Sequence, residues 1–129
     1  MPRLIRLFLA CLALAITTLA HAGDILPYSA STFAALTQAG KPVAIAVHAS
    51  WCSTCKAQKP IQQALMAEPA FKAITLLLVD FDGDQAVLQR FKVRAQSTLI
   101  VFKGSTEVGR SVGDTTRAGM AALFQRAAS

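Results

Sequence analysis

Two continuous runs of apolar residues lie in the middle of the chain, at Val43–Val47 and Ile74–Val79. Neither run alternates with polar residues, so neither has the period-two pattern of a strand with one face in water. Both runs are also short, which favours strands over helices. We therefore predict two central strands that are buried on both faces, and a shorter extended segment at Ile25–Tyr28.

Polar residues that cap helices, and glycines and prolines that end them, separate these strands. Five helical segments are expected: one to about Ala39 that is capped by Ser31, one from Cys52 to about Ala67, a short turn at Pro69, one over 85–91 that is capped by Asp84, and a last one that starts near Thr115 or Thr116. The helices therefore alternate with the strands.

A hairpin is expected near the C-terminus, because two strand-like segments are separated by only a short turn. Thr98–Phe102 and Glu107–Val112 flank the sequence Lys103-Gly104-Ser105, and so short a loop favours direct antiparallel pairing. This order of elements, without repeats or low-complexity linkers, predicts an α/β fold with a central mixed β-sheet flanked by helices on both faces.

The first 22 residues have the three parts of a secretory signal peptide. Arg3 and Arg6 form a basic segment, Leu7–Leu19 an apolar one, and Ala20-His21-Ala22 a cleavage box. The apolar segment is shorter than the roughly 20 residues that span a bilayer, so cleavage is favoured over an uncleaved anchor. We expect a periplasmic protein with one mature domain over residues 23–129.

The charge of the chain gives little indication of a partner. Removal of the leader takes away two arginines and lowers the formal net charge from +6 to +4. The remaining basic residues are spread along the chain and do not alternate with aromatic residues, so nucleic acid is not an expected partner. The mature length suits one domain with a single core, and we expect a monomer.

The tetrapeptide Cys52-Ser53-Thr54-Cys55 lies where the first apolar run gives way to a helical pattern. If Cys52 opens that helix, Cys55 lies on the same face at i+3, within reach of a disulfide. Cys52 would also face unpaired N–H groups at the positive end of the helix dipole, which favours the thiolate. We therefore predict that Cys52 is an exposed nucleophile and that Cys55 is its buried partner.

A Cys-x-x-Cys pair can also be half of a zinc site, which normally requires four nitrogen or sulfur ligands. Cys11 and His21 leave with the predicted leader, so the mature chain keeps only Cys52, Cys55 and His48. No metal site is therefore expected within one chain, and redox chemistry is preferred. A metal or iron–sulfur site that combines Cys52 and Cys55 from two chains, and an inert interaction domain with a static disulfide, stay open as alternatives.

Three aspartates follow the second apolar run, at Asp80, Asp82 and Asp84, and invite comparison with a calcium-binding loop. Their order departs from the EF-hand spacing, which requires a glutamate where this chain has Phe91. We expect a turn in which Asp84 caps the following helix.

The order of a buried strand, Trp51-Cys52-Ser53-Thr54-Cys55-Lys56, a helix that contains Pro60, and a closing hairpin resembles the thioredoxin family over essentially all of the mature chain. Asp80–Thr98 also aligns with the family without a gap. The resemblance implies a thioredoxin-like fold, thiol–disulfide exchange through the two cysteines, protein thiols or disulfides as substrates, and no organic cofactor. Glu68–Phe71 is similar to the corresponding region of membrane electron carriers, one candidate for the unidentified redox partner.

Three features depart from the family pattern. Ser97 stands where the family has a cis-proline. A cis bond before a non-proline residue costs about 2.5–4 kcal/mol, so we expect a trans Gln96–Ser97 peptide and weaker docking of substrate backbone. Ala46 and Leu78 replace a buried aspartate and a lysine, which removes the usual proton acceptor of the resolving thiol. Ser53-Thr54 replaces a glycine–proline pair between the cysteines.

Several neighbours of the dithiol are assigned lesser roles. Trp51 is expected to shield the cysteines and, with Gln96 and Ser97, to contact substrate. The hydroxyls of Ser53 and Thr54 could donate hydrogen bonds to a thiolate, or simply start the helix. His48, four residues before Cys52, could favour the thiolate as a nearby cation, or be an ordinary strand residue.

These residues together predict an exported thiol–disulfide oxidoreductase of the bacterial cell envelope. Cys52 attacks a substrate disulfide, and Cys55 resolves the mixed disulfide that forms. The reduction potential of the pair and its redox partner set the direction of electron flow.

Overall fold

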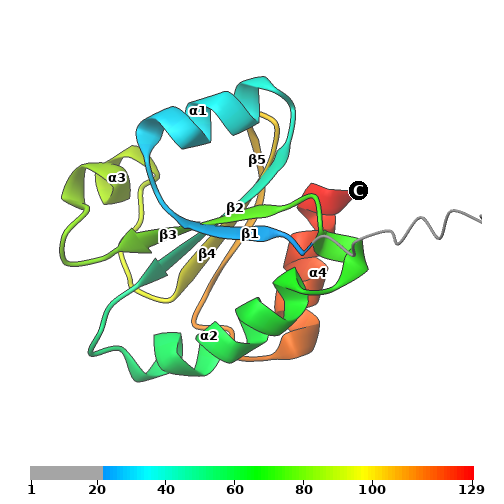
Figure 1. The fold of residues 1–129 in the computed structure, drawn as a ribbon. Helices are drawn as coiled ribbons and strands as arrows, with labels where there is room; N and C mark the ends of the chain where they lie inside the picture. Colours follow the sequence, from blue (N-terminus) through cyan, green and yellow to red (C-terminus); the bar gives the residue numbers. More distant parts are fainter. Residues whose placement is uncertain (1–21) are drawn as a thin grey trace, which may run out of the picture.

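The computed structural model describes residues 22–129, in which a five-stranded sheet lies between two layers of helices (Figure 1). The strands are β1 (Asp24–Pro27), β2 (Pro42–His48), β3 (Thr75–Asp80), β4 (Thr98–Lys103) and β5 (Thr106–Val112). The helices are α1 (Ala30–Gln38), α2 (Ser53–Met66), the 3-10 turn η1 (Pro69–Phe71), α3 (Gln85–Arg90) and α4 (Arg117–Ala128). The predicted leader lies outside the described residues, except for Ala22. Within residues 22–129, no helix combines the length and apolar character needed to cross a bilayer.

The strand order is β1-β3-β2-β4-β5. The first three strands in this order are parallel, and β4 and β5 are antiparallel to their neighbours. The two apolar runs of the sequence form β2 and β3, whose interior positions are almost all buried. At the hairpin Lys103 pairs with Thr106, and Gly104 between them adopts a φ of +59°, a conformation that glycine adopts without steric cost. The predicted mixed sheet is confirmed.

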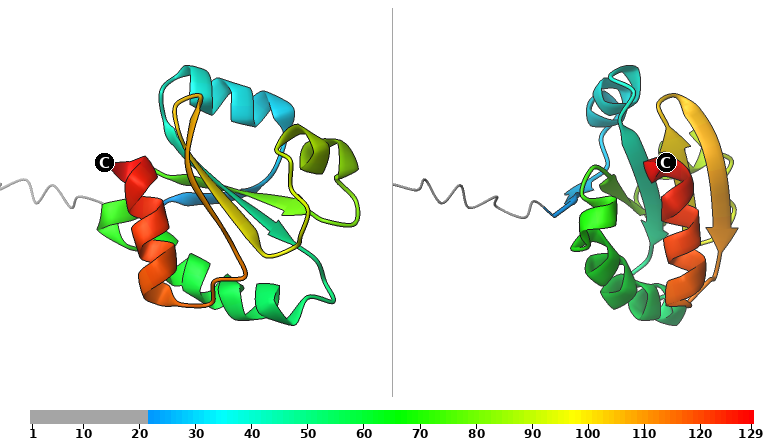
Figure 2. Two further views of the ribbon diagram at one scale, coloured as in Figure 1. Left: turned by 180° about the vertical axis from the view of Figure 1, so that it is seen from behind. Right: turned by 90° about the vertical axis from the view of Figure 1, so that its right-hand side faces the viewer.

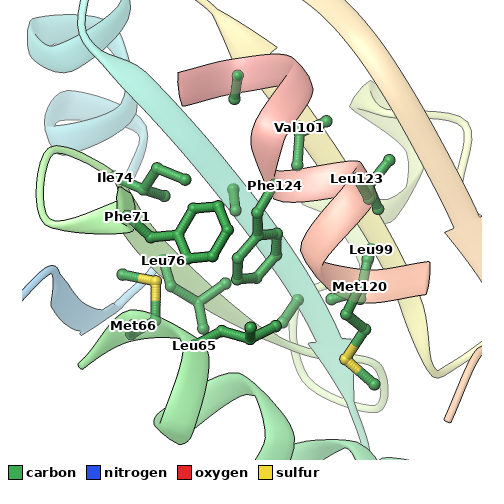
Figure 3. Packing of buried hydrophobic residues seen from close by; sticks show 13 residues of the cluster. Leu65, Met66, Phe71, Ile74, Leu76, Leu99, Val101, Met120, Leu123 and Phe124 are labelled. Carbon is green, nitrogen blue, oxygen red and sulfur yellow. The ribbon is translucent and has the colours of Figure 1, made fainter. Parts of the chain in front are cut away.

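Helices cover both faces of the sheet, with α2 and α4 on one side and α1 and α3 on the other (Figure 2). On the first side, Leu65 and Met66 of α2 meet Phe71 and Phe124 (Figure 3). The rings of Phe71 and Phe124 meet edge-on, with centroids 5.9 Å apart. Burial of each such side chain contributes about 1.5–3 kcal/mol, so α2 is anchored mainly through its C-terminal half.

One predicted helix cap is wrong, and a second is right in position but lacks its side-chain hydrogen bond. The cap of α1 is Ser29, whose Oγ accepts the Thr32 N–H at 3.1 Å, and Ser31 lies inside the helix. Asp84 is the N-cap of α3 as predicted, but its side chain makes no capping bond and instead accepts the N–H of Asp80 at 2.9 Å. In both places the side-chain oxygen lies near several backbone N–H groups, and the local backbone conformation decides which N–H it accepts. The start of α4 is as predicted, with Thr116 as its cap.

Candidate active site

The dithiol lies at the C-terminal end of β2, where the chain enters α2. Cys52 is the N-cap of α2, and its Sγ accepts the backbone N–H of Cys55 at 3.1 Å. The two cysteines form a disulfide, with their Cα atoms 5.3 Å apart. The i+3 spacing therefore brings the sulfurs together as predicted, and it places Cys52 Sγ among the free N–H groups of the helix start.

Both cysteines are buried in the disulfide form. Cys52 is 3% exposed and Cys55 8%, and they pack with Ala49 and Phe81. The expectation that Cys52 is the exposed member of the pair is therefore wrong for the disulfide form, because neighbouring side chains cover its sulfur. The two residues differ in another respect, since Cys55 lines a cavity behind the dithiol and Cys52 does not.

Trp51 stands beside the dithiol and is 57% exposed. Its Nε1–H donates to Asp82 Oδ2 at 2.7 Å, and its ring meets Phe81 edge-on at 6.5 Å. Asp82 N–H in turn donates to Asp80 Oδ1, so the aspartates form the hydrogen-bonded turn that the sequence predicts. The indole is thus held at the surface, where a substrate can reach it.

Among residues 22–129 there is no cluster of three or more His, Cys, Asp or Glu side chains suited to a metal.

The loop before β4 presents Ser97 in an unusual backbone conformation. No cis peptide occurs in the described part of the chain, so the predicted trans Gln96–Ser97 bond is confirmed, and Ser97 has a φ of +59°. Its N–H donates to the Val47 carbonyl at 2.8 Å and its carbonyl accepts the Gly113 N–H at 3.0 Å. Its hydroxyl donates to the Gln96 carbonyl at 2.5 Å. Both backbone groups of Ser97 are therefore used within the protein.

Gln58 of α2, which was not among the residues expected at the site, also holds this loop. Its Nε2 donates to the carbonyls of Ser97 at 3.2 Å and of Asp114 at 2.9 Å. The side chain is buried. The available signal was a glutamine three residues after Cys55, on a helix face that has to cover a sheet. Gln58 ties the helix that carries the dithiol to the loop opposite.

The remaining predicted neighbours make no hydrogen bond to either sulfur within the described residues. His48 is exposed at the end of β2, in register with Asp80. Ser53 is exposed and Thr54 half-buried in the first turn of α2. The structure thus gathers them around Cys52 and Cys55, and their effects on reactivity stay predictions.

Ala46 and Leu78 are paired in register on β2 and β3, and both line the cavity behind Cys55, which has a volume of about 300 Å³. The Cys55 Sγ lies 3.9 Å from the Val47 carbonyl oxygen. The side chains in the cavity wall include no carboxylate. A proton that leaves the Cys55 thiol therefore has no acidic side chain beside it to accept it.

The model of the thioredoxin family matches residues 24–126. The chain belongs to the thioredoxin family. The thioredoxin of Chlamydia trachomatis serovar D is 41% identical over 71 residues, which are 55% of this chain and 68% of that protein. The crystal structure of Trxlp from Edwardsiella tarda EIB202 is 37% identical, with a TM-score of 0.77 over 78% of this chain and 98% of that one. The thioredoxin of Malassezia sympodialis, 24% identical, shares the fold with a TM-score of 0.74 over 85% of this chain and 95% of that one.

Membership of this family and the disulfide-linked pair make the chain a protein thiol–disulfide oxidoreductase that acts on protein disulfides. The predicted thioredoxin-like fold is confirmed as well.

Proposed function

We propose that the protein is exported to the periplasm and exchanges disulfides with protein substrates there. The Cys52 thiolate attacks a substrate disulfide, and one substrate thiolate leaves and takes up a proton. The Cys55 thiolate then attacks Cys52 Sγ in the mixed disulfide and releases the second substrate thiolate. The substrate gains two electrons, and the enzyme is left with its own disulfide. The same steps in reverse oxidise a substrate dithiol.

The observation that carries this assignment of roles is the hydrogen bond from the Cys55 N–H to Cys52 Sγ at the start of α2. A fixed donor at that position stabilises negative charge on Cys52, both when it attacks and when it leaves. Cys55 Sγ instead faces a carbonyl oxygen, which can accept a hydrogen bond from a thiol but cannot donate one to a thiolate. Cys52 is therefore suited to attack and Cys55 to resolution.

The Ser97 loop bears on how substrates are held. Because the N–H and carbonyl of Ser97 are already bonded to Val47, Gly113 and Gln58, Ser97 has no free backbone group to offer an extended substrate. The exposed indole of Trp51 offers a large apolar contact instead. We infer that substrates bind through side-chain contacts near Trp51 more than through pairing with the loop.

Trapping of mixed disulfides tests these roles. With the Cys55→Ser variant, expressed with its own leader, we expect mixed disulfides with substrate proteins to accumulate through Cys52 and to disappear on treatment with dithiothreitol. The matched Cys52→Ser variant should trap none. Equal trapping by both variants would contradict the roles assigned here, and a metal-linked dimer or a coloured preparation would favour the alternative site formed by two chains.

The reduction potential of the Cys52–Cys55 pair determines the direction of electron flow. A value near that of cytosolic thioredoxin, about −270 mV, would identify a reductant, and a value near −120 mV an oxidant. A reductant needs an electron source, and a membrane electron carrier is the candidate that we propose.

Export is tested by cell fractionation and by the N-terminus of the mature protein. Cleavage at the predicted box leaves Gly23 as the first residue and brings the protein to the periplasmic fraction. Leu14→Arg, which places a charge in the apolar segment of the leader, should retain the protein in the cytoplasm. A wild-type protein that stays in the cytoplasm with its leader intact would contradict the proposal.

A further inference from the structure

The cavity behind the dithiol has an apolar floor and lies between α2 and the sheet. Its floor comes from three neighbouring strands, with Ile25 on β1, Ala46 on β2, and Leu76 and Leu78 on β3. Alternate residues of β2 face α2, and these are the small side chains Ala44 and Ala46. Because they project little from the sheet, they leave space that a larger residue would fill.

The α2 wall of the cavity is polar. Cys55, Lys59 and Gln62 lie at i, i+4 and i+7, on one side of the helix, and all three line the cavity. One turn further on, Leu65 and Met66 return to apolar packing against Phe71 and Phe124 (Figure 3). The helix thus faces the apolar floor with amides and two lysines as far as Gln63, and with apolar side chains after it.

Gln62 is the second observation that points to a ligand. It is 7% exposed, it lines the cavity, and no residue from 22 to 129 gives its side-chain amide a hydrogen bond. Because Ser111 Oγ is the one enclosed side-chain polar atom without a partner among the described residues, the Gln62 amide is open to the cavity, where water or a ligand can bond to it.

The charges around the cavity select the class of that ligand. Lys56 and Lys59 are exposed residues in the wall, which contains no aspartate or glutamate. Besides these two lysines, the titratable side chains in the wall are His48 and Cys55. An anion is therefore favoured over a cation, and the apolar floor requires an apolar body next to the charge.

We propose that the cavity binds a small monocarboxylate with an apolar body, and that its occupancy slows resolution by Cys55. The carboxylate accepts hydrogen bonds from Gln62 and Lys59. The body extends along the side of α2 that carries Gln62, Lys59 and Cys55. It reaches toward Cys55, about 10 Å from Gln62 at 1.5 Å per residue, and covers Ala46 and Leu78.

The effect on resolution rests on the proposed function and follows from the position of Cys55. Its proton leaves on the cavity side, where the wall has no carboxylate to accept it and where the His48 imidazole makes no hydrogen bond to the sulfur, so water in the cavity is the available acceptor. An apolar body displaces that water. Resolution then slows, because the Cys55 thiolate that attacks Cys52 forms less often.

Titration of the purified oxidised protein with sodium octanoate, followed by amide NMR, tests the site directly. We expect saturable shifts of the Gln62 side-chain amide and of the Cys55 and Leu78 backbone amides. Octanol, which lacks the charge, and sodium acetate, which lacks the body, should both bind more weakly. Octanol binding as tightly as octanoate, or shifts centred elsewhere, would overturn the proposal.

Matched variants then locate the carboxylate. Gln62→Leu removes the amide and should weaken octanoate binding about three- to tenfold. Lys59→Gln, an exposed change with little risk to folding, should weaken it about two- to fivefold. Lys103→Gln, a control on the hairpin, should bind as the wild type does. Unchanged affinity in both cavity variants would overturn the site.

The kinetic arm uses the reduced enzyme and an aromatic disulfide reagent that releases a coloured thiolate twice, first by attack of Cys52 and then by resolution through Cys55. Octanoate should leave the first release unchanged and slow the second in proportion to the occupied fraction. An unchanged second release at saturation would overturn the regulatory effect. If neither release occurs without octanoate, the proposed function fails, while the titration still decides the site.

Discussion

Substitutions of Ser97 by alanine, glycine and proline separate the features that hold the loop opposite the dithiol. Three features are involved: the hydroxyl bond to the Gln96 carbonyl, the φ of +59°, and the N–H bond to the Val47 carbonyl. Alanine removes only the hydroxyl. Glycine also relieves the left-handed backbone, and proline removes the N–H and cannot adopt this φ.

The magnitudes follow from these contacts. Ser97→Ala loses one partly buried hydrogen bond, worth about 0.5–1.5 kcal/mol. Glycine avoids the left-handed penalty of about 1–2 kcal/mol. It also raises the conformational entropy of the unfolded chain, which lowers stability by about 0.4–1 kcal/mol. Ser97→Gly should therefore be about 0.5–1 kcal/mol more stable than Ser97→Ala. Proline leaves the Val47 carbonyl without this donor, at about 1–3 kcal/mol, and its φ near −65° is incompatible with the loop. Ser97→Pro should therefore be at least about 2 kcal/mol less stable than Ser97→Ala.

Urea unfolding of the oxidised proteins, followed by far-UV circular dichroism, measures this series. The expected order of stability is glycine, then alanine, then proline, with equal m-values. Thermal midpoints should spread accordingly, by about 4–8 °C per kcal/mol for a domain near this size. A proline variant as stable as the alanine variant would refute the reasoning, because it would show that the loop requires neither the N–H bond to Val47 nor the positive φ.

Three further predictions concern the dithiol and its neighbours. In the reduced protein, iodoacetamide near neutral pH should label Cys52 before Cys55, as read by mass spectrometry; preferential labelling of Cys55 would reverse the roles. Ala46→Asp should accelerate the second release from the aromatic disulfide reagent, because residue 46 lines a cavity that has room for a carboxylate beside Cys55; a folded variant with an unchanged rate would exclude the missing base as a cause of slow resolution. Asp82→Asn should weaken the hold on the Trp51 indole and raise the KM for a protein disulfide, with a loss of stability below about 1 kcal/mol because both side chains are exposed; an unchanged KM would remove Trp51 orientation from substrate binding.

The sequence predicted the fold well because its strands are continuous apolar runs. Val43–Val47 and Ile74–Val79 have no polar face, so they require helices on both sides, and the structure buries them in that way. The short turn at Gly104 likewise left the hairpin little alternative. The cap at Ser31 was wrong, and the Asp84 side chain bonds elsewhere, because serine and aspartate can accept several nearby N–H groups and the choice depends on φ and ψ that composition does not encode.

The dithiol itself was evident from the sequence, but its surroundings depend on contacts between distant segments. The pairs Trp51 with Asp82 and Gln58 with Ser97 join residues 31 and 39 positions apart, and neither pair leaves a local signal. The cavity is a further example. It requires small β2 side chains to lie under the polar face of α2, and the sequence gives each feature separately without their alignment.

The carbonyl of Val47 connects two of the departures from the family pattern. It accepts the Ser97 N–H at 2.8 Å, and Cys55 Sγ lies 3.9 Å away. A proline has no N–H to donate. Serine therefore gives the Val47 oxygen a second donor besides the Cys55 thiol, and a backbone N–H is a stronger donor than a thiol. The oxygen is then less able to hold the proton of the Cys55 thiol. Ser97 therefore competes with the Cys55 thiol for this oxygen, in a site where Ala46 provides no base.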